Sequence, residues 1–343
     1  MTASRIPVWS RVTFLVLLPF VLYSAWDYIE SRRLESRLNV IQQRGEPTSP
    51  AYPQLTDESR QAERLYRAAA ALWKARNGLA TAWRQNQWTP DTIEVAREEV
   101  LANREALEFV DRAAMLPFVA FAPGTSYNYM AGDLMNLWRL LELRAAVESS
   151  ERRFDAALAS FYSEARLVRA IDALQVGIGM GGTVLPMFRG LSTVVSAAGS
   201  APGREPLSRA FADVDLDDRL RTEFLSRRVL LLNSQFAGNL TRHPANPFVA
   251  HLTVRQLDAY AAIIAAAAAP WPQRIEAVNA VGRWPLGFAS GNAAERDGLR
   301  NYTKSIAEQV KRIRCARLIV STQPLDLVDP FTGKRLEASS CHL

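Results

Sequence analysis

The stretch that decides the fold is LRAAVESSERRFDAALASFYSEARLVRA, residues 143–170. It begins inside a helical pattern that runs from about Tyr127 to Ser149, with one apolar face made by Leu134, Leu137, Leu140 and Leu141. The polar run SSERR, residues 149–153, interrupts this pattern, and a second helical pattern follows from Phe154 to Leu174. Because a short polar turn leaves two amphipathic helices side by side and antiparallel, the stretch predicts a helical hairpin.

Helical patterns continue on both sides of this hairpin. Thr56 and Asp57 can cap a helix that runs to about Gln85, and Thr89-Pro90 can open another that runs to about Met115. Further helices are predicted at Val184–Ala198, Leu216–Gln235, Val254–Ala269 and Ala293–Leu318. No segment alternates with period two for long enough to be a strand. The sequence therefore predicts an all-α protein, with a repeat-like bundle of helical hairpins over residues 56–318 and a C-terminal tail over residues 319–343, where any short β element would lie.

An apolar segment lies near the N-terminus. Residues 12–26 read VTFLVLLPFVLYSAW and carry no charge, and Ile6, Val8 and Trp9 extend the segment toward the roughly 20 residues that cross a bilayer. Trp9 and Trp26 would then lie at the two interfaces. We expect a transmembrane anchor over residues 1–29, followed over residues 30–55 by a charged helix and the linker GEPTSPAYP.

A cleaved signal peptide is the alternative for this segment. The best cleavage site has Tyr23 at its −3 position, where a small residue is preferred, so an uncleaved anchor is favoured. Only four of the 41 basic residues are lysine, a composition typical of bacteria with GC-rich genomes. Since a short N-terminal tail normally stays inside, we expect a single-pass protein of the bacterial inner membrane with its bulk in the periplasm.

The composition excludes several classes of function. Charged residues make up 22% of the chain and hydrophobic residues 48%, which is typical of a globular protein and not of a disordered one. The two cysteines form no CxxC motif, and the three histidines form no HExxH motif. Residues 177–182 contain GxGxxG, but they follow a helix instead of a strand, which favours helix packing over dinucleotide binding. His243 and His251 flank a loop without a nearby carboxylate. No catalytic, cofactor-binding or metal-binding residue is predicted.

The last long helix carries an apolar stripe of Leu299, Tyr302, Ile306, Val310 and Ile313. A basic face lies off this stripe and consists of Arg300, Lys304, Lys311, Arg312 and Arg314. Such a face could meet phospholipid, nucleic acid or an acidic partner, although a solvated face is the simpler interpretation. Nucleic acid is disfavoured because no aromatic side chains are interleaved with the basic ones.

Cys315 and Cys341 are the candidate pair for a disulfide. Cys315 lies about 160° from the apolar stripe of its helix and is therefore expected on the polar side. Cys341 is close to the chain end, and Pro324, Pro330 and Gly333 allow the chain to reverse between the two. We expect the bond if the body faces an oxidising compartment, and two unrelated thiols if it does not.

Two resemblances follow from these patterns. The pair of helices over residues 134–149 and 154–169, with Ala145, Ala157 and Phe161 at packing positions, resembles a tetratricopeptide-type hairpin. The chain also resembles a group of uncharacterised bacterial envelope proteins with an N-terminal anchor, a helical body and a C-terminal D-P-F-x-G-K-x-L tail. The tail here is Asp329–Leu336, and the body matches through ANREALEFVDRAA, residues 102–114. The segment before the tail is cut down to residues 321–328 here, and the resemblance implies no activity.

The favoured hypothesis is a membrane-anchored helical scaffold or protein-interaction module of the bacterial envelope. It has two alternatives: a hydrolase-like envelope enzyme with a site built from dispersed residues, or a lipid- or small-ligand-binding domain with residues 176–198 as a wall. No cofactor is expected, and the expected partners are the membrane and a protein.

Overall fold

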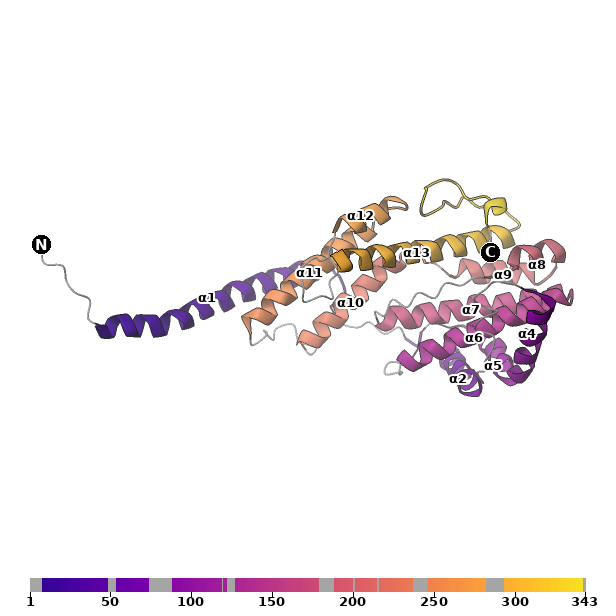
Figure 1. Ribbon diagram of the computed structural model, residues 1–343, viewed down its shortest axis with the longest axis horizontal. Coiled ribbons are helices and arrows are strands. Elements are labelled where there is room, and N and C mark those ends of the chain that lie inside the picture. The colour runs from indigo at the N-terminus through magenta and orange to yellow at the C-terminus, as the bar shows by residue number, and fades with distance from the viewer. Residues whose placement is uncertain are drawn as a thin grey trace, which may run out of the picture.

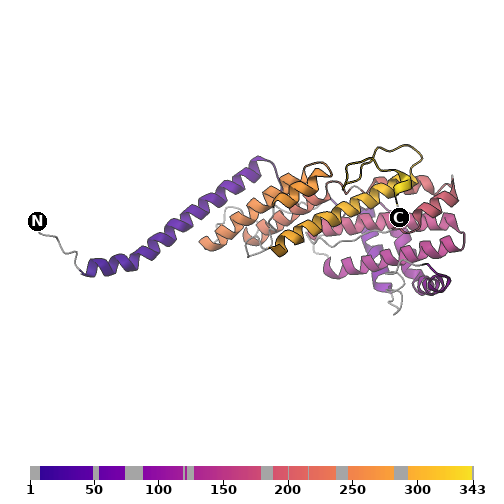
Figure 2. The same ribbon diagram turned by 45° about the horizontal axis from the view of Figure 1, so that its top comes forward.

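The protein is an elongated bundle of helices with one long helix projecting from an end. The computed structural model describes residues 8–48, 54–73, 88–118, 120–121, 127–178, 188–199, 201–214, 216–236, 246–281 and 293–341. Within these residues the ordered elements are helical, and the only β pairing is one antiparallel bridge between Val328 and Arg335. The all-α prediction is confirmed. Helix α1 (Val8–Gln43) extends away from the body, as Figures 1 and 2 show.

The predicted hairpin is confirmed as α6 (Tyr127–Ser150) and α7 (Phe154–Ile178), which pack along each other. The turn between them is tight because Arg152 adopts a left-handed backbone with φ of 58°. There Arg153 N–H donates to the Glu148 carbonyl at 2.9 Å, which satisfies one of the last carbonyls of α6. The four leucines predicted on the inner face of α6 are all buried, and Phe161 and Ala157 meet them from α7.

Three shorter helices cover one side of this hairpin: α2 (Asp57–Leu72), α4 (Pro90–Ala102) and α5 (Arg104–Ala114). The caps predicted at Thr56 and Thr89 are present, each side chain accepting a backbone N–H three residues on. The predicted helix to Gln85 was too long, because the backbone turns extended at Trp73. The predicted single helix to Met115 is broken at Asn103, whose amide donates to the Glu99 carbonyl at 3.0 Å.

The C-terminal half of the chain forms the other part of the body. It comprises α8 (Leu191–Ala198), α9 (Arg204–Ala212), α10 (Arg219–Phe236), α11 (Pro247–Ala267), α12 (Gln273–Val281) and α13 (Ala293–Val320). The short helices α9 and α12 were not predicted, and α11 begins earlier than expected because Asn246 caps it and Pro247 occupies its first turn. The five residues of the predicted apolar stripe on α13 are all buried in the core.

The second half of α1 belongs to the body. Leu34, Leu38 and Ile41 are at most 7% exposed and share a small core with Leu232 of α10 and with Ala250, Val254 and Leu257 of α11. Glu46, just after α1, forms an ion pair with the buried Arg228. Residues 30–46, predicted as a charged helix and the start of a linker, are therefore packed against the body. The rest of the predicted linker, from residue 49 to residue 53, lies outside the described residues.

In the part of the chain that the structure describes, no helix is both long enough and apolar enough to cross a membrane. The transmembrane anchor over residues 1–29 stays a prediction.

Candidate functional site

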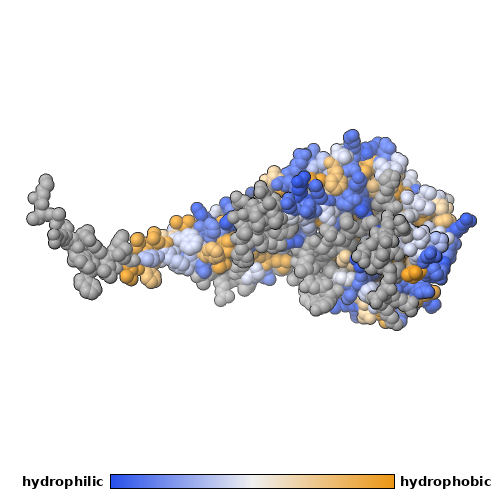
Figure 3. Space-filling view, viewed as in Figure 1, coloured by the Kyte–Doolittle hydropathy of each residue, from blue (hydrophilic) through white to orange (hydrophobic). Residues whose placement is uncertain are grey.

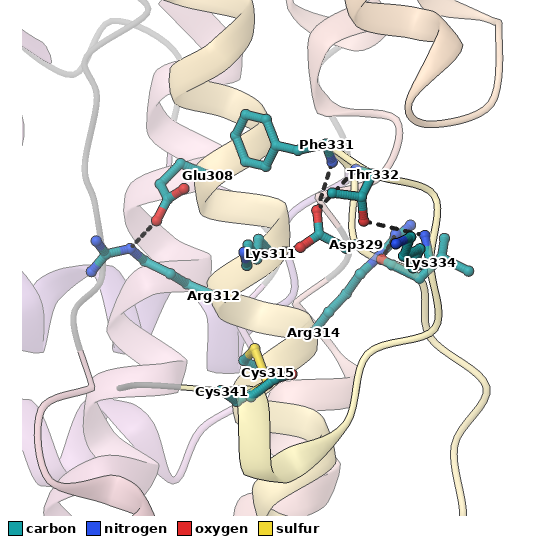
Figure 4. A network of polar contacts seen from close by, with 12 residues as sticks. Glu308, Lys311, Arg312, Arg314, Cys315, Asp329, Phe331, Thr332, Lys334 and Cys341 are labelled. Carbon is teal, nitrogen blue, oxygen red and sulfur yellow. Dashed lines mark hydrogen bonds and ion pairs between the residues drawn. A yellow bond between two sulfur atoms is a disulfide. The ribbon is translucent and has the colours of Figure 1, made fainter.

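The residues singled out from the sequence meet where the C-terminal tail crosses α13. Figure 4 shows the tail turning back over the helix, with Cys341 joined to Cys315 and Asp329 facing Lys311. The structure joins Cys315 and Cys341 by a disulfide, with their Cα atoms 5.3 Å apart. A short 3₁₀ helix, η1 (Ala338–Ser340), delivers Cys341 to this position.

The expectation that Cys315 lies on a polar face was wrong. Cys315 is 3% exposed and belongs to the main hydrophobic core. The reason is that α13 is enclosed on every side at this level: the four consecutive residues from Ile313 to Ala316 are all buried. One helix face packs on the bundle, and the tail covers the face that the periodicity assigns to solvent.

The tail forms a tight turn whose chemistry explains the D-P-F-x-G pattern. The Asp329 carboxylate accepts the backbone N–H of Phe331 at 2.7 Å and of Thr332 at 3.3 Å, so it caps the turn. Gly333 follows with φ of +68°, a conformation that favours glycine, and a Cβ there would lie 3.0 Å from the Pro272 ring. The single β bridge, between Val328 and Arg335, closes the turn and is the β element expected in this tail.

The predicted basic face is divided between the tail and the solvent. Lys311 binds the Asp329 carboxylate at 2.9 Å. Arg314, only 8% exposed, donates to the Val328 carbonyl at 2.6 Å and to Asp217 at 2.7 Å. Arg312 pairs with Glu308 on its own helix at 3.2 Å. Arg300 and Lys304 alone among the five are exposed, so these residues do not form one open basic surface.

The electrostatics of the turn favour the docked tail. Partial burial alone would raise the pKa of Asp329. The Lys311 ammonium and the two backbone N–H donors nevertheless hold this pKa below its usual value. The carboxylate is therefore ionised throughout the neutral range, and two of the five residues of the basic face, Lys311 and Arg314, hold the tail.

A second polar cluster, which sequence analysis missed, joins α5, α6 and α7. The Arg144 guanidinium binds both carboxylate oxygens of Asp111, at 2.7 and 2.8 Å, and donates to the Ser160 hydroxyl at 2.8 Å. Ser160 in turn donates to Glu148 at 2.5 Å. Burial raises the pKa of Glu148, and the hydrogen bond from Ser160 and the positive charge of Arg144 offset only part of this effect.

A cavity of about 290 Å³ lies over this cluster, where α4 and α5 meet the end of α6. Its wall is apolar on one side and charged on the other, and the lining residues are Val100, Leu101, Arg104, Leu107, Glu108, Arg144, Val147, Glu148 and Arg153. Leu101 is 66% exposed at the rim. None of the lining residues carries a hydroxyl, thiol or imidazole, so the ionisable groups of the cavity are the carboxyl groups of Glu108 and Glu148 and the guanidinium groups of its three arginines.

The interior of the hairpin also holds two buried carboxyl groups. Glu164 of α7 is fully buried and accepts the Trp138 indole N–H at 2.8 Å. Burial, followed by the nearby charge of Glu142, raises the pKa of Glu164 well above its usual value. Burial and the neighbouring carboxylate therefore both disfavour the ionised form of Glu164 inside the hairpin.

The remaining predicted features give little chemistry. His251 Nδ1 lies 3.3 Å from the buried Glu30 carboxylate of α1, while His243 and residues 179–182 of the glycine motif lie outside the described residues. Among the described residues, no group of histidine, cysteine and acidic side chains could hold a metal ion.

The first half of α1 carries a run of exposed apolar side chains. Val16, Leu17, Phe20, Val21 and Leu22 are each more than half exposed. Figure 3 shows apolar residues gathered on this projecting part of the helix, in contrast to the hydrophilic surface of much of the body. Comparison of the chain with protein-family models, with curated proteins and with solved structures finds no match.

Proposed function

We propose that this chain is a membrane-anchored helical interaction module of a bacterial cell envelope, with its body in an oxidising compartment. The observation that carries the proposal is the exposure of apolar side chains all around the projecting half of α1. At about 100° per residue, Leu17 lies about 100° and Leu22 about 240° around the helix from Val16, and each of the three is more than half exposed.

A helix that is apolar on every side needs an apolar environment on every side. The body does not supply one, because the described contacts of α1 with the body begin only at Glu30. The sequence continues the apolar run backward to Val12 without a charge, which adds the length that a bilayer needs. A lipid bilayer fits this requirement better than a groove on a partner, which would cover one side only.

The disulfide supports the oxidising side of the membrane for the body. Disulfides persist in the periplasm and outside the cell, and are rare in the cytosol, where thiols are kept reduced. Both cysteines of the chain are in the bond, and both are buried under the tail. A disulfide can hold the tail on α13 only in an oxidising compartment, where it is not reduced.

The cavity on the hairpin is the proposed contact point for a protein partner. Its volume of about 290 Å³ suits one or two side chains, and its combination of apolar wall, guanidinium groups and carboxylates is typical of a protein-binding surface.

Alkaline extraction of membranes from cells that express the full chain tests the anchor. We expect the protein to stay in the pellet, and the variant V16D/F20D to be released. The variant V95D is the matched control, since Val95 is also an exposed apolar helix residue, 45% exposed, but lies on the body. Release of the unchanged chain at high pH would overturn the anchor.

The partner site is tested by crosslinking in whole cells with a photoreactive residue at the cavity rim. We expect a defined crosslinked species from position 101 and none from position 115, because Met115 is 75% exposed but does not line the cavity. The same pattern from both positions, or none from either, would count against a partner at the cavity.

A further inference from the structure

Two side-chain contacts, a Glu–His contact and an ion pair, fix how α1 lies along the body. Glu30 contacts His251 at 3.3 Å and Arg37 contacts Asp258 at 2.6 Å. Both pairs join residues 221 positions apart in the chain, so α1 and α11 run parallel and in register. Each residue of α1 in this region therefore lies level with the residue of α11 that is 221 positions later.

This register locates the end of the body on α1. Pro247, the first residue of α11, is level with Trp26, so the part of α1 before Trp26 extends past α11 (Figures 1 and 2). The same point divides the sequence of α1: residues 12–26 are uncharged, and Asp27 is the first of a series of charged residues. The N-terminal end of α11 and the last residue of the apolar run of α1 therefore lie at the same level along the helix.

An exposed aromatic residue of the body lies at this level. Phe248, in the first turn of α11, is 53% exposed, although its backbone N–H is held by the Asn246 side chain at 2.9 Å. It is level with Asp27, next to Trp26, which is itself 38% exposed. Aromatic side chains from two different helices at one height are the arrangement that membrane proteins use at the lipid–water interface.

Two exposed arginines follow just beyond the depth of the headgroup layer. The headgroup layer of one leaflet is about 5 to 8 Å thick, or about four or five residues of helix. Counted from Trp26, that layer ends near residue 31, and the next two residues are Arg32 and Arg33, whose side chains are 64% and 60% exposed and pair with Glu35 and Glu30 on the same helix. Guanidinium groups that are exposed at this depth are within reach of anionic headgroups.

The junction between α1 and the body is rigid. Leu34, Leu38 and Ile41 are buried against α10 and α11. The Glu30–His251 and Arg37–Asp258 contacts lie beside these buried residues. Helix α1 and the body therefore share one set of packed side chains. A bilayer around the first half of α1 would hold the N-terminal end of α11 at a fixed height relative to the bilayer.

We infer that the body stands directly on the bilayer, with the first turn of α11 and the ring of Phe248 in the headgroup layer at the depth of Trp26. The partner of this surface is a phospholipid layer containing anionic lipid. The inference rests on the proposed anchor and adds to it the orientation of the body and its second contact with the membrane.

Fluorescence quenching on the full chain in vesicles tests the inference. Phe248→Cys is labelled with bimane, and the native cysteines do not react because they are bonded to each other. Leu22→Cys reports on the anchor, and Met115→Cys, at a position of the body that is 75% exposed, is the control. The vesicles contain phosphatidylcholine with a minor fraction of phosphatidylglycerol, with or without a nitroxide lipid.

We expect a nitroxide at the headgroup to quench most of the fluorescence at position 248 and a nitroxide deep in the acyl chain to quench less, with the reverse order at position 22 and no quenching at position 115. Quenching at position 22 without quenching at position 248 would overturn the inference and leave the anchor intact. No lipid quenching at position 22 would overturn the anchor and the inference together. Shielding of position 248 from a water-soluble quencher without lipid quenching would mean contact with protein, and would also overturn the inference.

Discussion

Breaking the disulfide is expected to destabilise the protein by about 3.5 kcal/mol. The bond closes a loop with a sequence separation of 26 residues. In the chain-entropy relation a loop of this length restricts the unfolded chain by about 12 cal/mol/K, which is about 3.5 kcal/mol at room temperature. The double variant C315A/C341A removes the cross-link without introducing a buried hydroxyl, since both cysteines are at most 5% exposed.

The measurement is guanidinium unfolding of the full chain in mild detergent, followed by circular dichroism at about 222 nm. The unchanged chain is measured with and without a dithiol reductant, and the double variant serves as the control that should not respond to reductant. We expect reduction to lower the unfolding midpoint and the double variant to unfold near the reduced protein. Equal midpoints for all three samples, or two reactive thiols in the protein before reduction, would refute the reasoning.

Three further predictions concern the turn, the helix junction and the buried carboxyl pair. Gly333→Ala should lower the unfolding free energy more than Gly45→Ala, because both glycines have positive φ but only a Cβ at position 333 meets a neighbour within 4 Å. In denaturant unfolding, each substitution should cost at least the roughly 1 to 2 kcal/mol by which a side chain disfavours the left-handed conformation. Leu38→Ala should cost about 2 to 5 kcal/mol by the same measurement, whereas Leu101→Ala, at an exposed position, should cost less than about 0.5 kcal/mol; equal effects would mean that residues 30–46 do not share the core. Because the pKa of Glu164 is raised in the folded protein, its contribution to stability is fully present below the pKa of the unfolded carboxyl and is lost as pH rises through the folded pKa. Glu164→Gln should therefore be more stable than the unchanged chain at neutral pH and not at acidic pH. A difference in unfolding free energy that does not depend on pH would contradict the raised pKa.

The long helices could be predicted because their burial follows one period. The inner residues of α6 and the stripe on α13 repeat every three or four positions, and the structure buries all of them. The short helices α9 and α12 have nine residues each, which is too short for a period to stand out from a single sequence. The break at Asn103 was missed because a side chain bonding to the backbone ended the helix while the apolar pattern continued.

The site was predicted in part, and the failures have one physical cause. Periodicity assigns each helix an inside and an outside, but α13 has a second covered face under the tail. Cys315 and Arg314 therefore lie inside the protein although their angular position places them outside. The Arg144 and Asp111 cluster joins residues 33 positions apart, and only the packing of three helices brings them together.

The packed junction between α1 and the body bears most directly on function. The signal for it was present in the sequence: Leu34, Leu38 and Ile41 follow spacings of four and three, which is a helical stripe within an otherwise charged segment. The segment was predicted as a charged helix leading into a linker, yet three residues on one face are enough to join a helix to a bundle. A helix joined in this way cannot let the body move freely about its projecting half. The helices α4 and α5, which line the hairpin cavity, lie at the end of the body opposite the projecting helix (Figure 1), so with the proposed anchor in a bilayer a partner would be met at a set distance from the membrane surface.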